Sequence, residues 1–342
     1  MKIKFTKLQT TDGTIKVSLD GGDSFTDYNI ADIHKSGIPL DDNQDYEKNQ
    51  IQASANVLKN LNIVSSVKVE GEGAGAGSTN EPFFIMDTDT YGFEFSKCVT
   101  GIVLPNGMTT IGKSGFDDYT YLQTIIIPEG VTSIVNYAFH GCTSLTSINI
   151  PESVTFIGSS VFCYCSSLTS ITIPNGVTSI GEKAFGYCSS LTSITIPESV
   201  TSMGQNAFEC CTGLTSVTIS DGVTTIGQSV FYRCTSLTRI NIPESVTVIG
   251  NGTFCYCRRL TSITIPESVT SIGNSAFYKC TGLKSIIISE SVTFIGQDAF
   301  YNCISLKTIN YIGTKEQWST ISNRHYWTPG TTVNVIYNYK PE

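Results

Sequence analysis

Residues 260–282 read LTSITIPESVTSIGNSAFYKCTG, and nearly the same 23 letters recur along most of the chain. The leucine that opens this stretch returns every 23 residues, at Leu122, Leu145, Leu168, Leu191, Leu214, Leu237, Leu260, Leu283 and Leu306. Eight full units therefore run from 122 to 305, and a ninth, degenerate unit covers 99–121. A fixed period of this length is typical of proteins in which each repeat packs only on its neighbours.

Each unit contains two short patterns that predict strands. If the leucine is position 1, isoleucine or valine fills positions 4 and 6, as Ile263 and Ile265 do, so one side of the segment is apolar. Proline usually follows at position 7 and ends the strand, because it has no backbone N–H to donate. The V-T-x-I-G run after it predicts a second brief strand, and its glycine permits a corner that a side chain would obstruct.

The unit closes with A-F-x-x-C, as in Ala276, Phe277 and Cys280, and this spacing predicts a single helical turn with all three side chains on one face. Phenylalanine holds its place in all nine units, at Phe116, Phe139, Phe162, Phe185, Phe208, Phe231, Phe254, Phe277 and Phe300. One unit cannot bury these residues alone, so we expect stacked coils with strands roughly 4.8 Å apart and each phenylalanine on the next.

The combined pattern L-x-x-I-x-I-P-x-x-V-x-x-I-G-x-x-A-F-x-x-C closely resembles the BspA-like class of leucine-rich repeats, over about 99–310. The segment INYIGTKEQWSTI, 309–321, resembles the end segment that follows such arrays. The resemblance implies a leucine-rich-repeat solenoid, β-rich with short helical turns and coiled in a right-handed curve. It also implies a bacterial or protist surface protein, often an adhesin for host matrix proteins or other cells.

The two ends of the chain do not follow the repeat. Residues 1–95 contain alternating segments such as TIKVSLDGG, which predict a small β-rich domain or N-terminal cap, and the glycine-rich stretch 71–82 predicts a linker or a long hairpin loop. Nine repeats then occupy 96–305. Residues 306–342 include Trp318 and Trp327 and predict a C-terminal cap over the last coil.

Composition excludes several classes of partner. The net charge of −8 and pI near 5.0 are the opposite of what a phosphate backbone attracts, so we expect no nucleic-acid partner. The sequence contains no run of about 18 apolar residues, the length that a membrane-spanning helix needs. The N-terminus lacks the apolar core of a signal peptide, so either a leader has been removed or none is made. We expect a monomer that is secreted or on the cell surface.

Eight of the twelve cysteines keep the repeat spacing, at Cys142, Cys165, Cys188, Cys211, Cys234, Cys257, Cys280 and Cys303. This spacing is not a zinc pattern, and parallel side chains on stacked coils would have to distort the coil to form disulfides. We therefore expect buried, reduced thiols and no metal or cofactor. Cys163, Cys210 and Cys255 precede the ladder by one or two positions, which predicts a place nearer the surface, where each thiol is either structural or reactive.

Two faces of the predicted solenoid are candidates for binding. Positions 3 and 5 of the first strand form a face of serine and threonine, which either keeps the strands soluble or offers hydrogen bonds to a protein or sugar. The opposite edge carries the residue types enriched at binding hot spots. The candidate partner-binding residues there are Tyr164, Tyr187, Tyr232, Arg233, Tyr256, Arg258, Arg259, Tyr278 and Lys279, with Tyr301 in the same row, and Arg239 is a further candidate at position 3 of the strand face. The alternative is that each tyrosine only covers the neighbouring coil.

No residue pattern predicts catalysis. The three histidines, His34, His140 and His325, fall in different segments, and Asp117 and Asp118 are adjacent without an obvious reason to face each other across a substrate. We predict a non-enzymatic recognition protein that binds host or microbial proteins or glycans through the solenoid surface. The alternative is a structural spacer that presents the N-terminal domain in a larger assembly.

Overall fold

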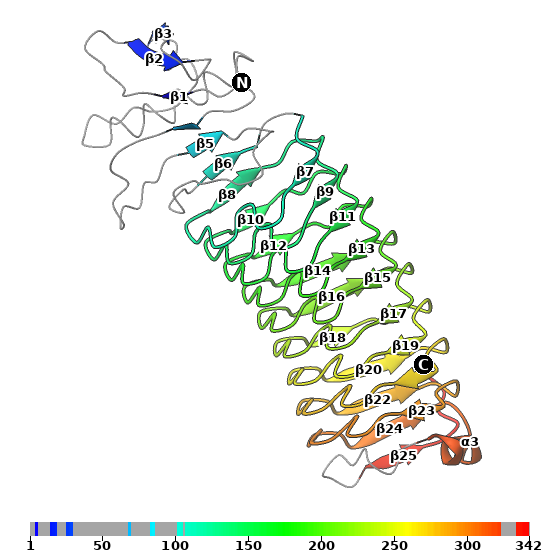
Figure 1. Cartoon of the computed structure of the whole chain (residues 1–342). Helices are drawn as coiled ribbons and strands as arrows, with labels where there is room; N and C mark the ends of the chain where they lie inside the picture. Colours follow the sequence, from blue (N-terminus) through cyan, green and yellow to red (C-terminus); the bar gives the residue numbers. More distant parts are fainter. Residues whose placement is uncertain are drawn as a thin grey trace.

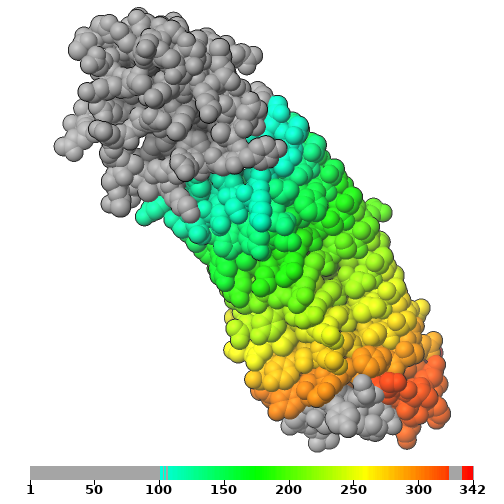
Figure 2. Space-filling view, viewed as in Figure 1, coloured from blue at the N-terminus to red at the C-terminus, as the bar shows by residue number. Residues whose placement is uncertain are grey.

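The computed structural model describes residues 4–5, 14–18, 25–29, 68–69, 83–85, 101–104, 107–322 and 333–341 of the 342-residue chain. From 107 to 322 the chain winds into successive coils that stack in sequence order (Figure 1). The space-filling view shows these coils as one continuous elongated body (Figure 2). The glycine-rich stretch 71–82, Cys98 and most of 1–95 lie outside the described residues.

One side of the solenoid is a single parallel sheet built from the V-T-x-I-G runs. Each run supplies one inward-facing apolar residue, such as Ile180 or Ile226, so a two-residue strand suffices in each coil. Its nine strands lie side by side in chain order (Figure 1). They are β7 (Thr110–Ile111), β9 (Ser133–Ile134), β11 (Phe156–Ile157), β13 (Ser179–Ile180), β15 (Ser202–Met203), β17 (Thr225–Ile226), β19 (Val248–Ile249), β21 (Ser271–Ile272) and β23 (Phe294–Ile295).

A second side is built from the L-x-x-I-x-I segments, with one further strand before them and one after them, and is divided into four short parallel sheets. The strands alternate outward polar and inward apolar residues, as Ser193, Ile194, Thr195 and Ile196 do. The strands are β5 (Phe83–Ile85), β6 (Gly101–Val103) and β8 (Thr124–Ile126); β10 (Ser147–Ile148) and β12 (Ser170–Ile171); β14 (Ser193–Ile196), β16 (Ser216–Ile219) and β18 (Arg239–Ile240); and β20 (Ser262–Ile265), β22 (Ser285–Ile288), β24 (Thr308–Tyr311) and β25 (Asn334–Ile336).

The stacking is in register from β6 to β24, and every paired residue lies one repeat from its partner. Thr195 pairs with Thr218 and Ile157 with Ile180, for example, and each pair is separated by 23 residues. Equivalent side chains therefore lie directly above one another. The predicted period thus sets the position of every residue on the surface of the solenoid.

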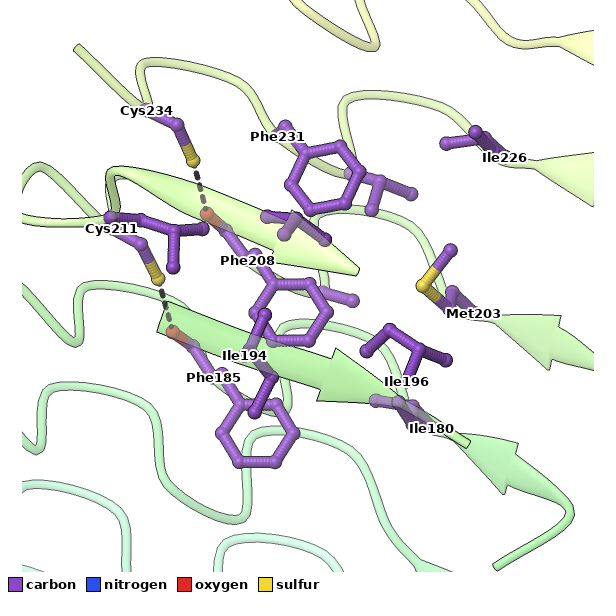
Figure 3. Close-up of a cluster of buried hydrophobic side chains, with 14 of the residues drawn as sticks. Ile180, Phe185, Ile194, Ile196, Met203, Phe208, Cys211, Ile226, Phe231 and Cys234 are labelled. Atoms are coloured by element: carbon purple, nitrogen blue, oxygen red, sulfur yellow. Dashed lines mark hydrogen bonds between the residues drawn. The ribbon is translucent and has the colours of Figure 1, made fainter. Parts of the chain in front are cut away.

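The core is a continuous column of equivalent side chains. All nine repeat phenylalanines are fully buried, and their rings stack on one another along the axis. Phe208 lies 5.1 Å from Phe185 and 5.7 Å from Phe231 between ring centroids, with nearly parallel rings (Figure 3). The repeat leucines are also fully buried, so the predicted solenoid core is confirmed.

The third side, which we call the turn side (positions 16–21 of each repeat), is not helical, and the prediction of short helical turns is wrong there. In the repeat of Phe185, alternate N–H groups donate to the next coil: Lys183 to Gln205, Phe185 to Ala207 and Tyr187 to Glu209. The N–H groups between them donate to carbonyls three residues earlier. Lys183 and Tyr187 are left-handed, with φ of 51° and 61°. Two left-handed residues per turn rule out a helix.

The chain ends contain the remaining elements. Four strands, β1 (Lys4–Phe5), β2 (Thr14–Ser18), β3 (Phe25–Asn29) and β4 (Lys68–Val69), form a mixed sheet in the order β3-β2-β1-β4. Beyond the last coil, α3 (Lys315–Thr320) is the one helix of the described residues, and Thr314 caps it. The buried Trp318 contacts Tyr311, and β25 pairs with β24. Whether 1–95 and 306–342 act as an independent domain and a cap stays a prediction.

Candidate functional site

The predicted partner-binding residues divide between two sides of the solenoid. Arg239 lies on β18, on the side built from the L-x-x-I-x-I segments, which we call the strand face or strand side. It is therefore separate from the other candidates. The tyrosines, Arg233 and Lys279 occupy positions 19 and 20 on the turn side, and Arg258 and Arg259 follow directly after one of these turns. Arg239 at position 3 therefore does not share a side with the candidates at positions 19 and 20.

Seven residues from four successive coils lie in contact on the turn side, and we call them the turn-side cluster. They are Tyr232, Arg233, Tyr256, Arg258, Tyr278, Lys279 and Tyr301. The Tyr256 ring lies 5.9 Å from Tyr232 and 5.8 Å from Tyr278, edge to face in both cases. Tyr301, in the same row, stacks on Tyr278 at 5.3 Å and extends the cluster by one coil.

Three cations surround the ring of Tyr256. The Arg233 guanidinium lies 5.3 Å from the ring centroid, the Arg258 guanidinium 5.6 Å and the Lys279 ammonium 5.2 Å, all within cation–π range. The Lys279 Nζ also donates to the Tyr256 hydroxyl at 3.3 Å, and this hydrogen bond raises the pKa of the lysine. Lys279 is therefore charged at neutral pH, and the rings limit the rotamers of all three cations.

The backbone under the turn-side cluster is fixed by coil-to-coil hydrogen bonds. Arg233, Tyr256 and Lys279 all have left-handed φ, between 56° and 64°. Their N–H groups donate to carbonyls of Cys255, Tyr278 and Tyr301, each at 2.8 Å. Left-handed φ is unfavourable for non-glycine residues and persists where the surroundings enforce it. The outward directions of these side chains are therefore set before any partner arrives.

Tyr164 and Tyr187 form a separate pair nearer the N-terminus. Their rings stack at 4.4 Å, and the Tyr187 hydroxyl donates to Glu209 at 3.4 Å. Burial, followed by the charge of Glu209, raises the pKa of Tyr187. The coil of Glu209 and Cys210 separates this pair from the turn-side cluster, so the ten candidates do not form one continuous site.

Sequence reasoning missed a group formed by Asp117, Asp118 and His140. The His140 Nδ1 lies 2.8 Å from the Asp117 carboxylate, and donor atoms of all three residues lie within 4.8 Å of one another. Rings of Tyr137 and Tyr164 flank the imidazole at 5.8 and 5.6 Å. The signal was in the sequence, because Asp117 and His140 occupy the same repeat position one unit apart. Nitrogen and carboxylate donors suit a divalent cation, but all three side chains are partly or fully exposed.

The prediction of a buried, reduced thiol ladder is confirmed. The eleven cysteines at described positions are all free, and the eight ladder residues are fully buried. Each ladder Sγ donates to the phenylalanine carbonyl of the preceding coil, as Cys211 does to Phe185 at 3.1 Å (Figure 3). Burial raises the pKa of the thiols from Cys165 to Cys280 in the ladder, as at Cys188. They therefore pack and donate hydrogen bonds and do not act as nucleophiles.

Cys163 and Cys255 are more buried than predicted, because position 19 turns small side chains inward beneath the neighbouring tyrosines. Only 3% and 6% of their surfaces are exposed, and burial raises the pKa of each to about 11. Cys210 is half-buried, and burial likewise raises its pKa. The alternative of reactive thiols at these positions is therefore not supported.

We expect Cys163 and Cys255 to react slowly with iodoacetamide in the folded protein. With pKa values of about 11, about one thiol in a thousand is ionised at pH 8, and only the thiolate reacts. Labelling followed by peptide mass spectrometry should show rates rising about tenfold per pH unit between pH 8 and 10. The urea-unfolded chain is the control. Labelling of the folded protein at the unfolded rate at pH 8 would contradict the burial described here.

Two sets of threonine and serine hydroxyls recur along the repeats. Those at positions 2 and 11 donate to the equivalent carbonyl one coil earlier, as Thr215 does to Thr192 at 3.0 Å and Thr247 to Thr224 at 3.2 Å. Those at positions 3 and 5, such as Ser193 and Thr195, are exposed on the strand face. The first set therefore stabilises coil stacking, and the second faces solvent.

The part of the chain that matches a known protein family is the repeat region. The family model of the BspA-type leucine-rich repeat region matches residues 87–215 and 201–326, with six copies. No curated protein matches the chain. No helix among the described residues is long and apolar enough to cross a membrane.

Several solved structures of bacterial repeat proteins are similar. A leucine-rich cell surface protein of Faecalibacterium prausnitzii is 28% identical, covering 66% of this chain and 82% of its own, with a TM-score of 0.35. A leucine-rich repeat protein of T. pallidum is 27% identical, covering 56% and 91%, with a TM-score of 0.46. The pneumococcal vaccine antigen PcpA is 22% identical, covering 66% and 67%, with a TM-score of 0.47. The family match covers more than half of the chain, and the chain therefore belongs to the BspA-type leucine-rich repeat family.

Proposed function

We propose that this protein is a non-catalytic recognition protein, secreted or on the cell surface, that binds a protein or glycan ligand through the outside of its solenoid. Membership of the BspA-type family supports an interaction role. The observation that carries the proposal is the turn-side cluster, in which tyrosines and cations from four coils project from a hydrogen-bonded backbone. Tyrosine and arginine are the side chains most enriched at interface hot spots.

A rigid solenoid suits this role because its binding surface is ordered in advance. Affinity is reduced by every side chain or loop that must become ordered on binding. Here the backbone at Arg233, Tyr256 and Lys279 is already held by hydrogen bonds to the next coil. The area of the surface and its fixed side chains, rather than a reactive group, supply the binding free energy.

The test is a binding screen of the intact chain against host and microbial proteins and glycans. Each ligand found is then tested against two variants with three substitutions each. One is the turn-side triple Tyr232→Ala, Arg233→Ala, Tyr256→Ala, and the other is the strand-face triple Ser193→Ala, Thr195→Ala, Thr218→Ala. We expect the turn-side triple to lose binding and the strand-face triple to keep it. If both folded variants bind as the parent does, recognition lies elsewhere, and the spacer alternative gains support.

A further inference from the structure

The turn side of three successive coils carries positive charge and no negative charge. Residues 227–237, 250–260 and 273–283 contain Arg233, Arg258, Arg259 and Lys279 but neither aspartate nor glutamate, in a chain whose net charge is −8. On the opposite corner of the same three coils, position 8 carries Asp221, Glu244 and Glu267, and the next coil adds Glu290, all exposed. The charges of the solenoid are therefore segregated across its width.

The cations of the turn-side cluster have no carboxylate partner within the described residues. The ion pair found in that part of the chain joins His140 and Asp117, several coils away. The nearest acid in the same row, Glu209, accepts hydrogen bonds from Asn206 at 2.6 Å and Tyr187 at 3.4 Å. Arg233, Arg258 and Lys279 contact tyrosine rings instead, which position them without neutralising them.

We propose, on the basis of the recognition function proposed above, that the turn-side cluster binds an acidic segment of a partner protein. Each guanidinium offers a planar fork that matches a carboxylate, and the Lys279 ammonium adds a third charge on the same surface. The positive area spans three coils, roughly 10 Å between the outer two. That length accommodates a short acidic stretch, and its charge also attracts such a stretch from a distance.

The geometry favours a protein segment over a polysaccharide. A neutral sugar binds an aromatic side chain through a free ring face, but Tyr278 is stacked on Tyr301 and cations surround Tyr256. A long polyanion binds along an extended basic track, and here Glu209 interrupts the row one coil before Tyr232. Tyrosine edges and hydroxyls beside arginines are the mixture found in protein–protein hot spots.

The proposal is tested with the full-length chain and a fluorescent 12-residue peptide of alternating glutamate and alanine, measured by anisotropy. We expect saturable binding that weakens roughly tenfold or more between 0.05 and 0.5 M salt, because exposed charges are screened. The variant Arg233→Gln, Arg258→Gln should bind at least about tenfold more weakly. Arg239→Gln is the control for loss of an exposed arginine from the strand face, and it should bind as the parent does; the single variant Arg233→Gln, which changes the charge by the same amount, should bind more weakly than Arg239→Gln.

Three outcomes would overturn the inference. The first is that the glutamate peptide does not bind. The second is that Arg239→Gln loses as much peptide affinity as the double variant. The third is that a sulfated polysaccharide binds more tightly than the peptide and depends on the turn-side cluster. Circular dichroism and thermal unfolding confirm that each variant is folded. The binding screen proposed above distinguishes failure of this inference from failure of the proposed function. If a partner no longer binds the turn-side triple, but its binding to the parent does not depend on salt, the recognition function stands and the preference for an acidic segment is wrong.

Discussion

Replacing Phe208 by alanine is expected to lower the free energy of unfolding by about 4 kcal/mol, measured by urea denaturation. The ring is fully buried and stacked between Phe185 and Phe231, so its loss leaves a cavity that the neighbouring coils cannot fill without shifting. In a solenoid each repeat is stabilised only by its neighbours, so the cavity weakens two interfaces at once.

Phe156→Ala is the matched control for this change. Phe156 lies on β11 with 40% of its surface exposed, so the same atoms are removed from an outward position. We expect a loss of at most about 0.5 kcal/mol there. Equal losses at Phe156 and Phe208 would mean that the phenylalanine column does not support the fold.

Gly181→Ala is expected to cost about 3 kcal/mol, although it adds only one methyl group. Gly181 occupies position 14, and in this coil an added Cβ would overlap the backbone of Gly158 and Ser159 in the coil before. Backbone atoms of a packed coil cannot move aside as a flexible side chain does. The φ of Gly181 is an ordinary one, so the requirement is for space and not for backbone freedom.

Gly112→Ala makes the same substitution at position 14 of the first repeat, where a Cβ meets nothing within 4 Å. We expect no destabilisation there, and a gain of about 0.5 kcal/mol from the stiffer unfolded chain. Urea midpoints of the two variants, measured side by side, check this. If Gly181→Ala were as stable as Gly112→Ala, the coils would not be as close as the structure places them.

The 23-residue period predicted the register of the solenoid and most of its core. Once Leu, Ile, Phe and Cys repeat at fixed positions, stacking in register is the arrangement that buries them all, and Phe208 and Cys211 lie where the pattern placed them. The reduced state of the thiol ladder followed from the same geometry.

The turn side could not be predicted as well, because side-chain spacing does not report backbone conformation. The A-F-x-x-C spacing is compatible with a helix, but Lys183 and Tyr187 adopt left-handed φ. Their N–H groups bond to the next coil, an arrangement that a single unit considered alone does not reveal. The same gap explains why Cys163 and Cys255 were expected nearer the surface than they are.

Residue types alone predicted which side chains could form the candidate site. Which of them are neighbours follows from their positions within the 23-residue repeat. Assigning Arg239 to position 3 separates it at once from Arg233 at position 20. The same counting brings Asp117 beside His140, although the two residues are 23 apart in sequence. In a stacked repeat, residues at equal positions are neighbours, and this rule is stronger than proximity along the chain.

Hydrogen exchange of the intact chain, followed by mass spectrometry, tests most directly whether the recognition surface is ordered before a partner binds. Alternate amides on the turn side, such as those of Phe231, Arg233, Phe254 and Tyr256, donate to the next coil. Peptides covering 227–237, 250–260 and 273–283 should therefore exchange at least about a hundredfold more slowly than an unstructured chain, as slowly as the strands β16 and β20. Exchange of these turn peptides at the rate of an unfolded chain, with the strands still protected, would contradict the account.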